Sequence, residues 1–180
     1  YLFRIKKMAE KAGFQYYAKI PWEKVGFVAN TGRSAKNSED VLFFTLGKPM
    51  NLRPDAKKDK ADPSTHHFMS GAAGMLPTAF RVAPPSKKER YHQAEKPWQL
   101  LKEILQFITV PGDVVLDQFA SSGSTGVGAL KSHRNAIMIE LAHEFVGTII
   151  HRFQTMHLGL STFRTCDLSE EPILGQTAAG

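Results

Sequence analysis

The spacing of apolar residues along the chain predicts alternating helices and strands, the arrangement typical of an α/β domain. Apolar positions at a helical period predict helices over residues 1–12, 95–108 and 143–156. Compact apolar runs predict strands over residues 14–22 and 41–46. Between residues 51 and 90 the periodicity disappears, so no regular element is predicted there.

Residues 111–141 contain the most regular part of this pattern. Apolar and β-branched runs predict strands over 113–119 and 135–141, separated by a turn over 120–126 and a helix over 127–132. The strands are apolar throughout, which is typical of parallel strands covered on both faces. The turn consists of Ala, Ser, Gly and Thr alone. This strand, turn, helix and strand predict one half of a doubly wound α/β sheet.

The same stretch has the features of a nucleoside site. Small residues in a turn let a ligand approach the backbone, and the following helix directs free N–H groups toward it. Glu140 follows Asp117 by 23 residues, at the tip of the next strand. An acid at that distance is placed to accept hydrogen bonds from ribose hydroxyls. We therefore expect a nucleoside to bind at this edge of the sheet.

Two common phosphate motifs are absent. Gly123 and Gly128 have the spacing of a GxxxxGK[ST] loop, but Ala129 stands where that loop needs lysine. Gly123, Gly126 and Gly128 have the wrong order of gaps for the dinucleotide motif GxGxxG. A nucleoside without a triphosphate remains, and S-adenosylmethionine is the leading candidate.

Several segments resemble a known enzyme family. The run VVLDQFASSGSTGVGAL resembles the D-P-F-x-G-S-G-T-T cofactor motif of amino-group DNA methyltransferases. HQAEKP followed by WQLLKEILQFI resembles the H-P-T-x-K-P segment and helix of their permuted (beta-type) subclass, whose catalytic segment precedes the cofactor segment. AKIPWEKVG and SEDVLFFTLGKP resemble two further segments of these enzymes. The resemblance covers most of residues 1–155 and is weakest between 51 and 90.

The resemblance implies a Rossmann-like doubly wound methyltransferase sheet, mostly parallel, with an antiparallel edge hairpin. It also implies that S-adenosylmethionine is bound by Lys96, Pro97, Asp117, Phe119, Ala120, Ser122, Gly123, Ser124, Thr125 and Glu140. Two positions depart from the family pattern. Gln118 replaces the usual proline, and Ser121 stands where the family prefers glycine, so its Cβ would crowd the cofactor if φ is positive there.

The catalytic motif of the family, [DNS]-P-P-[YFW], does not occur in this sequence. The only Pro-Pro pair, Pro84 and Pro85, has neither an acidic or amide neighbour nor an aromatic one. In the permuted order the motif belongs upstream of Tyr1, on a central strand between those predicted over 113–119 and 14–22. The catalytic residues are therefore unknown. We expect the chain to be the later part of a longer enzyme, because it does not begin with methionine; a cut-down relative that binds without catalysing is the alternative.

Charge is distributed unevenly along the chain. The formal net charge of +6 divides into +4 for residues 1–47, +5 for 48–90 and −3 for 91–180. Positive charge kept off the cofactor half predicts a polyanionic partner, although a merely solvated basic loop is the simpler alternative. By resemblance the basic stretch is a target-recognition region that would contact DNA phosphates. The candidate residues are Arg53, Lys57, Lys58, Lys60, Arg81, Lys87, Lys88 and Arg90.

The amino-acid composition also indicates the cellular compartment. A single cysteine, Cys166, fits a reducing cytoplasm, and no apolar run approaches the ~20 residues of a membrane span. We predict four segments, a catalytic-half segment over 1–47, the basic insert over 48–90, the cofactor half over 91–158 and a tail over 159–180.

The function predicted from the sequence is methyl transfer from S-adenosylmethionine to N6 of adenine or N4 of cytosine in DNA, in a restriction-modification setting. No metal site is predicted, and a homodimer is compatible with the family. The runner-up is a catalytically inactive methyltransferase-like module that binds nucleic acid or protein. A third alternative, methylation of protein or RNA, is disfavoured only by the basic insert. The sequence does not distinguish adenine from cytosine or give the target sequence.

Overall fold

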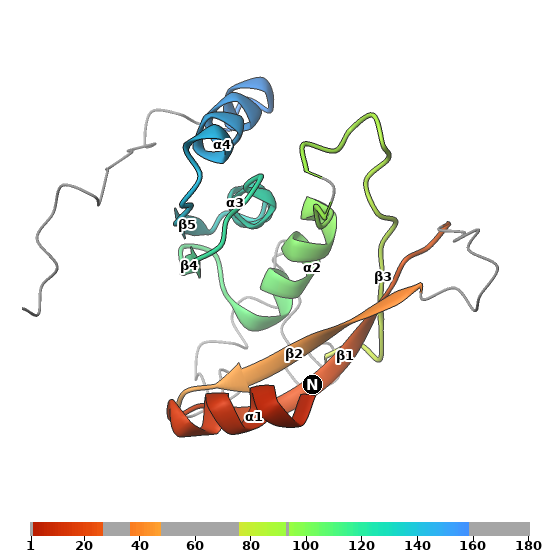
Figure 1. Cartoon of the computed structure of the whole chain (residues 1–180), viewed down its shortest axis with the longest axis vertical. Helices are drawn as coiled ribbons and strands as arrows, with labels where there is room; N and C mark the ends of the chain where they lie inside the picture. Colours follow the sequence, from red (N-terminus) through yellow and green to blue (C-terminus); the bar gives the residue numbers. More distant parts are fainter. Residues whose placement is uncertain (1, 27–36, 48–75, 93, 159–180) are drawn as a thin grey trace, which may run out of the picture.

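The computed structural model describes residues 2–26, 37–47, 76–92 and 94–158 (Figure 1). The helices in these ranges are α1 (Leu2–Lys11), α2 (Trp98–Ile108), α3 (Ser124–Leu130) and α4 (His143–Thr155). The strands are β1 (Gln15–Glu23), β2 (Ser38–Thr45), β3 (Phe80–Arg81), β4 (Val114–Asp117) and β5 (Asn135–Met138). The predicted order of elements is confirmed, and β3 is added to it. None of the described helices is long and apolar enough to span a membrane.

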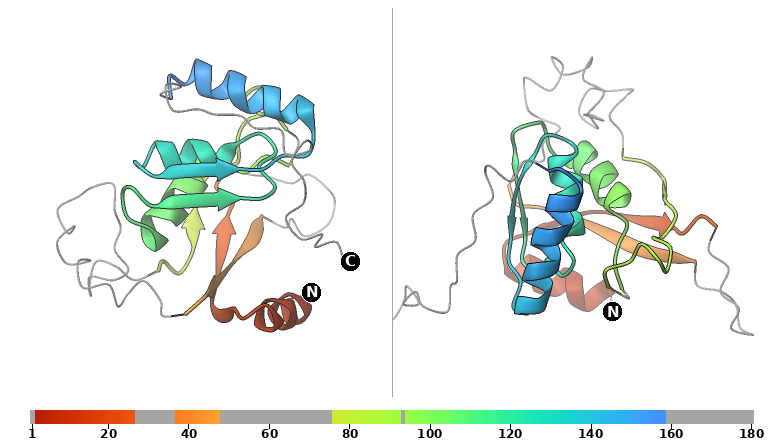
Figure 2. Two further views of the ribbon diagram at one scale, coloured as in Figure 1. Left: turned by 90° about the vertical axis from the view of Figure 1, so that its left-hand side faces the viewer. Right: turned by 90° about the horizontal axis from the view of Figure 1, so that it is seen from above.

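The described strands form two sheets. The first has the order β2-β1-β3, and the second pairs β4 with β5 in parallel. β1 and β2 form the predicted antiparallel hairpin, which runs from Gln15 opposite Thr45 to Glu23 opposite Ser38 with a register shift between Tyr16 and Ala18. Figure 2 shows the β4–β5 pair apart from the β1–β2 hairpin, with the strands of the two sheets running in different directions.

β3 corrects the expectation of a stretch without regular structure over 51–90. Trp22 and Phe80 are paired in a parallel ladder, and the indole N–H of Trp22 donates to the carbonyl oxygen of Val82 at 2.8 Å. Two residues are too short a run for periodicity to reveal, and their partner lies 58 positions earlier. β1 therefore has neighbours on both edges, while β2 and β4 are edge strands among the described residues. The predicted central catalytic strand and residues 48–75 lie outside what the structure describes.

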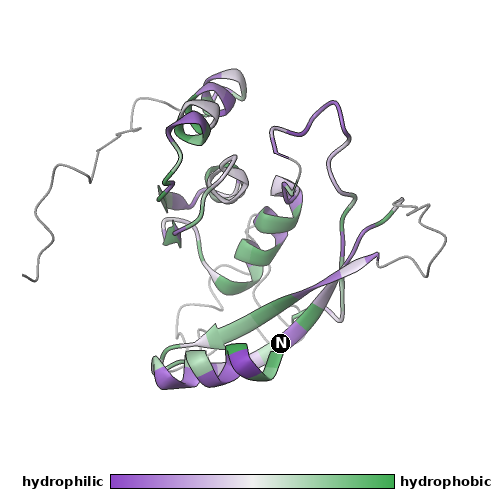
Figure 3. Cartoon of the chain, in the orientation of Figure 1, coloured by the Kyte–Doolittle hydropathy of each residue, from purple (hydrophilic) through white to green (hydrophobic). Residues whose placement is uncertain are grey.

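Helix α2 joins the two sheets. Its Leu100 is buried in one core with Ile20, Trp22 and Phe43 from the first sheet. On its other side α2 packs against α3, where a Cβ on Gly128 would lie 2.8 Å from the backbone nitrogen of Lys102. In Figure 3 α2 is largely hydrophobic along its length. The helix is thus covered on two sides, because it lies between the first sheet and α3.

The starts of two predicted helices need correction. α2 begins at Trp98 with Pro97 as its N-cap, rather than at residue 95. α3 begins at Ser124, so the small-residue turn ends three residues earlier than predicted. Small residues are compatible with either a turn or a helix start, and only the packing of Ser124, Gly126 and Gly128 under neighbouring elements decides between them.

The expectation that the β4 and β5 strands are covered on both faces is wrong for the described residues. One face packs against α3, but the other carries exposed apolar side chains, among them Val114 at 60% and Ile137 at 54% exposure. Leu116 on the same face is 53% exposed. A parallel sheet with one bare apolar face is unusual, since such strands are normally buried on both sides.

Replacement of Gly128 by alanine is expected to lower the free energy of unfolding by about 2 kcal/mol, the usual effect of overpacking. The added Cβ would meet backbone atoms of α2, which cannot move aside as a flexible side chain can. Urea denaturation measures the change. The matched control is Gly147→Ala in α4, where no atom lies within 4 Å of the added Cβ, and where we expect a gain of about 0.5 to 1 kcal/mol. Equal stability of Gly128→Ala and the wild type would contradict the close approach of α2 and α3.

Candidate functional site

The predicted acidic residues lie at one edge of the β4–β5 sheet. Asp117 is the last residue of β4, and Glu140 comes two residues after β5. The parallel ladder aligns these ends, and Ile139 N–H donates to the carbonyl oxygen of Asp117 at 2.8 Å. Ala120 N–H donates back to the carbonyl oxygen of Ile139 at 3.0 Å. The structure therefore brings Asp117, Glu140 and the loop after β4 together.

Both carboxylates bind backbone N–H groups of the connecting segments. Glu140 accepts from Ser121 N–H at 2.7 Å and from Ala142 N–H at 2.8 Å, one bond at each oxygen. Asp117 accepts from Phe119 N–H at 3.0 Å. A carboxylate has about four acceptor positions, so each group keeps acceptor capacity for ligand hydroxyls. Ribose binding by Glu140 stays a prediction, and its bond to Ser121 is a role that the sequence did not reveal.

The loop between β4 and α3, residues 118–123, is tightly turned. Ser121 has a φ of 46° and Gly123 a φ of 76°, both in the left-handed region. A Cβ on Gly123 would lie 3.0 Å from Cγ1 of Ile149. Only glycine adopts this region without steric cost, so the loop requires glycine at 123 and strains the serine at 121. From the sequence, the Cβ of Ser121 is expected to crowd the cofactor if φ is positive at this position. The structure has that positive φ.

The predicted cofactor residues of this loop divide by exposure. Ala120, Ser122, Gly123 and Ser124 are buried, beneath α4. Thr125 and Asp117 are partly buried. Phe119 is 86% exposed, so its ring belongs to no core of the described residues. A ligand at this edge would meet Phe119, Asp117 and the backbone of the loop, while the buried residues shape the loop from behind.

Lys96 and Pro97 lie at the start of α2. The Lys96 ammonium pairs with a carboxylate oxygen of Glu39 on β2 at 3.0 Å, and lies 5.9 Å from the ring centre of Trp22. Pro97 is the helix N-cap. In this arrangement the Lys96 side chain links the start of α2 to the first sheet. Its predicted contact with a cofactor stays a prediction.

Glu39 is the acceptor of two lysines. Lys24 approaches it at 2.6 Å and Lys96 at 3.0 Å. Partial burial acts to raise the pKa of Glu39, but hydrogen bonds and charge attraction from Lys24 and Lys96 outweigh burial and leave the pKa below its usual value.

Sequence reasoning missed two buried charges beside the loop. The Arg152 guanidinium pairs with Glu95 at 2.9 Å, and their side chains are only 5% and 2% exposed. A signal was present in the sequence, because Arg152 follows Phe145 by seven and Ile149 by three positions, on the apolar stripe of α4. A charge on a buried stripe needs a partner, which sequence alone does not name.

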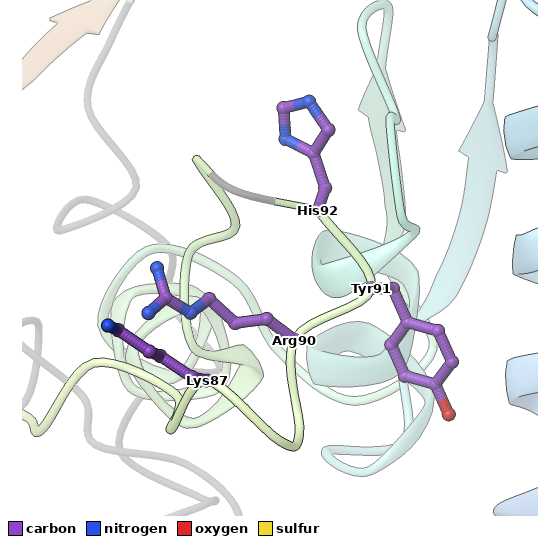
Figure 4. A pocket seen from close by; sticks show the side chains of 4 residues that line it. All are labelled: Lys87, Arg90, Tyr91 and His92. Carbon is purple, nitrogen blue, oxygen red and sulfur yellow. The ribbon is translucent and has the colours of Figure 1, made fainter.

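The predicted DNA-contacting residues divide into three groups. Lys87 and Arg90 line a pocket of about 410 Å³ together with Tyr91 and His92, and Figure 4 shows Lys87 and Arg90 extending to the same side of their loop. Lys88 lies in the same loop. Arg81 instead pairs with Glu23 at 2.9 Å across β1 and β3. The remaining four lie outside the described residues: Arg53, Lys57, Lys58 and Lys60. No cluster of metal-binding side chains occurs within the described ranges.

A family model described as DNA methylase matches residues 1–151. The chain is 36% identical over 110 residues to the DNA adenine methyltransferase YhdJ of Escherichia coli (strain K12), a match covering 61% of this chain and 36% of that protein. It is 28% identical over 160 residues to the Type II methyltransferase M.BglI of Bacillus subtilis, covering 86% of this chain and 43% of that protein. The chain thus spans less than half the length of these two curated relatives.

The fold is also similar to that of a solved structure, the crystal structure of the M1.HpyAVI–SAM complex. The TM-score is 0.63 at 24% identity, and the match covers 84% of this chain and 69% of that one. A likeness at this identity shows the fold alone. It confirms the predicted Rossmann-like α/β class.

Replacement of Ser121 by glycine is expected to raise the free energy of unfolding by up to about 1 kcal/mol, since relief of left-handed strain outweighs the extra freedom of glycine when unfolded. The bond from the backbone N–H to Glu140 is retained. The reciprocal change, Gly123→Ala, adds a Cβ at positive φ against Ile149 and is expected to lower stability by about 1–3 kcal/mol. Thermal and urea unfolding measure both variants. A less stable Ser121→Gly protein would show that residue 121 is not strained.

Stability is expected to depend on pH through Glu39. Because its pKa in the folded protein is below the ordinary value of a glutamate, its stabilising contribution is present above that ordinary value and is lost as pH falls through the lowered pKa. The Glu39→Gln variant lacks the carboxylate and therefore lacks this pH-dependent contribution to stability. The difference in unfolding free energy between wild type and variant should therefore be greatest near neutral pH and shrink in acid. Added salt should reduce it as well, because the three groups are partly exposed. A difference independent of pH would contradict the assignment.

Proposed function

The chain belongs to the DNA methylase family, and on that premise we propose that it carries the cofactor-binding part of a DNA methyltransferase. The reaction is transfer of a methyl group from S-adenosylmethionine to an exocyclic amino group, N6 of adenine or N4 of cytosine. The segment order is that of the permuted subclass, and the setting is restriction-modification. The enzyme acts in the cytoplasm, where its DNA substrate lies, and a homodimer is the assembly to be tested.

The observation that carries the proposal is the edge formed by Asp117, Glu140 and the loop between them. Two carboxylates with remaining acceptor capacity flank a loop with positive φ at Ser121 and Gly123. The exposed ring of Phe119 offers an apolar surface beside them. The acids can accept hydrogen bonds from ribose hydroxyls, and the apolar ring can contact the base. The loop backbone is open to close approach by the methionine part of S-adenosylmethionine.

The residues assigned to cofactor binding have different tasks in this proposal. Glu140 accepts from ribose hydroxyls, and Asp117 and Phe119 contact the cofactor from the end of β4. The buried residues of the loop set its shape. Lys96 and Pro97, which directly precede α2, form the opposite wall of the site. The bound cofactor supplies a sulfonium methyl group. The amine nitrogen of the target base forms the new bond to the methyl carbon as the carbon–sulfur bond breaks, and the amine releases a proton.

The loop that carries Lys87, Lys88 and Arg90 is proposed to contact the DNA backbone. Lys87 and Arg90 line one pocket, which suits a phosphate group. Lysine and arginine bind phosphate without reading sequence, so these contacts would position DNA rather than select a site. The basic residues outside the described ranges, Arg53, Lys57, Lys58 and Lys60, are assigned the same task, and Arg81 is left to its pair with Glu23.

A second candidate function is an inactive module that binds nucleic acid or protein. One observation favours it: Ser121 has a strained, positive φ at a position where the family prefers glycine. The two candidates differ in cofactor binding and in turnover.

Calorimetric titration with S-adenosylmethionine tests the proposal. We expect micromolar binding by the wild type and its loss in Asp117→Ala, because the mutant loses both a ligand contact and the bond that fixes Phe119 N–H. Asp40→Ala, an exposed carboxylate on β2 paired with Lys19, is the matched control and should bind normally. Thermal unfolding of each variant establishes that it is folded.

A methylation assay on duplex DNA follows for the protein that binds. Transfer of the labelled methyl group to adenine or cytosine supports the enzyme, and hydrolysis to nucleosides identifies the acceptor. A folded wild-type protein that binds no cofactor overturns the proposal in favour of the inactive module.

A further inference from the structure

The buried guanidinium of Arg152 contacts two segments that lie far apart in the sequence. From α4, its Nη1 donates to the carbonyl oxygen of Ser122 at 2.9 Å and to the hydroxyl of Ser124 at 3.1 Å. Its Nη2 pairs with Oε1 of Glu95 at 2.9 Å. One side chain thereby joins α4, the loop after β4 and the segment that leads into α2.

Glu95 extends this connection. Its second oxygen, Oε2, accepts from Tyr91 N–H at 2.9 Å, and its first also lies 3.4 Å from the hydroxyl of Ser124. The Arg152 guanidinium lies 5.0 Å from the ring centre of Tyr91. Tyr91 lines the basic pocket, and Lys96 follows Glu95 directly in the chain. The ion pair therefore contacts the loop after β4 at Ser122, the start of α3 at Ser124, and Tyr91 in the segment that leads to α2.

Stability alone does not explain a pair of this kind. Removing two charges from water is costly, and apolar residues of similar volume often stabilise a core at least as well. Moreover, Nε of Arg152 is buried without a hydrogen-bond acceptor in the described part of the chain, which adds a desolvation cost. What an apolar pair cannot do is donate to the carbonyl of Ser122 and fix the direction of the loop.

We infer that Arg152 and Glu95 are positioning residues that hold the loop between β4 and α3 in its ligand-binding shape. The inference rests on the proposed function, since the loop is the proposed cofactor site. Arg152 acts through Ser122 and Ser124, which are buried and face α4, and not by touching the ligand itself. Glu95 orients the guanidinium and ties it to the segment of Tyr91 and Lys96.

Two variants separate positioning from folding. Arg152→Lys keeps the charge, but a single ammonium group cannot reproduce the planar fork that contacts Ser122 and Glu95 together. The double variant Arg152→Met with Glu95→Gln removes both charges, retains an acceptor for Tyr91 N–H, and leaves no unpaired buried ion. It is expected to remain folded, with a melting temperature near that of the wild type, while the Ser122 carbonyl loses its donor.

The matched control is Arg134→Lys. Arg134 is 1% exposed and donates to the carbonyl oxygens of Thr109 and Ser132. It precedes β5, at the end of the strands opposite the loop. This change alters a buried arginine of the same domain without touching the loop, so it reports the effect of lost stability alone.

Two measurements are made on all forms of the full chain. Calorimetry should give an S-adenosylmethionine dissociation constant raised about tenfold in both test variants, the effect of losing roughly one charge-assisted hydrogen bond, and unchanged in Arg134→Lys. Hydrogen exchange without ligand should be faster at the amides of residues 119–124 in the test variants, and unchanged in the β1–β2 hairpin.

The outcomes separate the two proposals. Normal binding and normal loop exchange in the folded double variant overturn the positioning role. If no form binds S-adenosylmethionine, the proposed function fails, yet loop exchange still decides whether Arg152 and Glu95 order this segment. Equal acceleration of exchange in Arg134→Lys would mean that the loop only follows global stability, which also overturns the inference.

Discussion

The parallel pairing of β4 with β5 is the constraint on which the candidate site depends. Parallel strands need a crossover, and residues 118–134 supply it, with α3 (Ser124–Leu130) as its helix. Between the end of β4 and the start of α3 the chain turns with positive φ angles at Ser121 and Gly123. Because both strands end at the same edge, Asp117 and Glu140 meet there although 23 residues separate them. The acids and the loop geometry are thus consequences of one ladder.

Helix α2 connects the part of the chain that contains the site to the first sheet. Gly128 lets α3 approach the α2 backbone closely, while Leu100 anchors α2 in the core beneath β1. The ion pair between Lys96 and Glu39 adds a polar link from the start of α2 to β2. Two sheets that share no ladder in the described residues are therefore linked through two packed helices, because α2 contacts the first sheet and α3 contacts β4 and β5.

Strand edges and one apolar sheet face are exposed in the described part of the chain. β2 and β4 are edge strands in the described part of the chain, and the face of β4 and β5 opposite α3 exposes Val114, Leu116 and Ile137. An exposed apolar face is unusual for a parallel pair of strands, because such strands are normally covered on both sides. The buried pair of Arg152 and Glu95 lies on the opposite side, under α4, where polar groups are fixed instead of exposed. The domain thus has one side with exposed apolar side chains and another whose buried polar groups contact the loop after β4.

The sequence by itself determined the order of elements, the α/β class and the placement of Asp117 and Glu140 at the ends of neighbouring strands, while the antiparallel hairpin was expected from the family resemblance. The first three follow from local information, since hydrophobic period and small-residue turns are set by neighbouring residues. Only the tertiary structure decided that β3 pairs with β1, that Lys96 binds Glu39, and that the ring of Phe119 is exposed. It also decided that Ser122 and Ser124 are buried under Arg152. The physical reason is that each of these outcomes depends on a partner distant in sequence, and a pattern of residues predicts that a buried charge needs a partner without saying which element brings it.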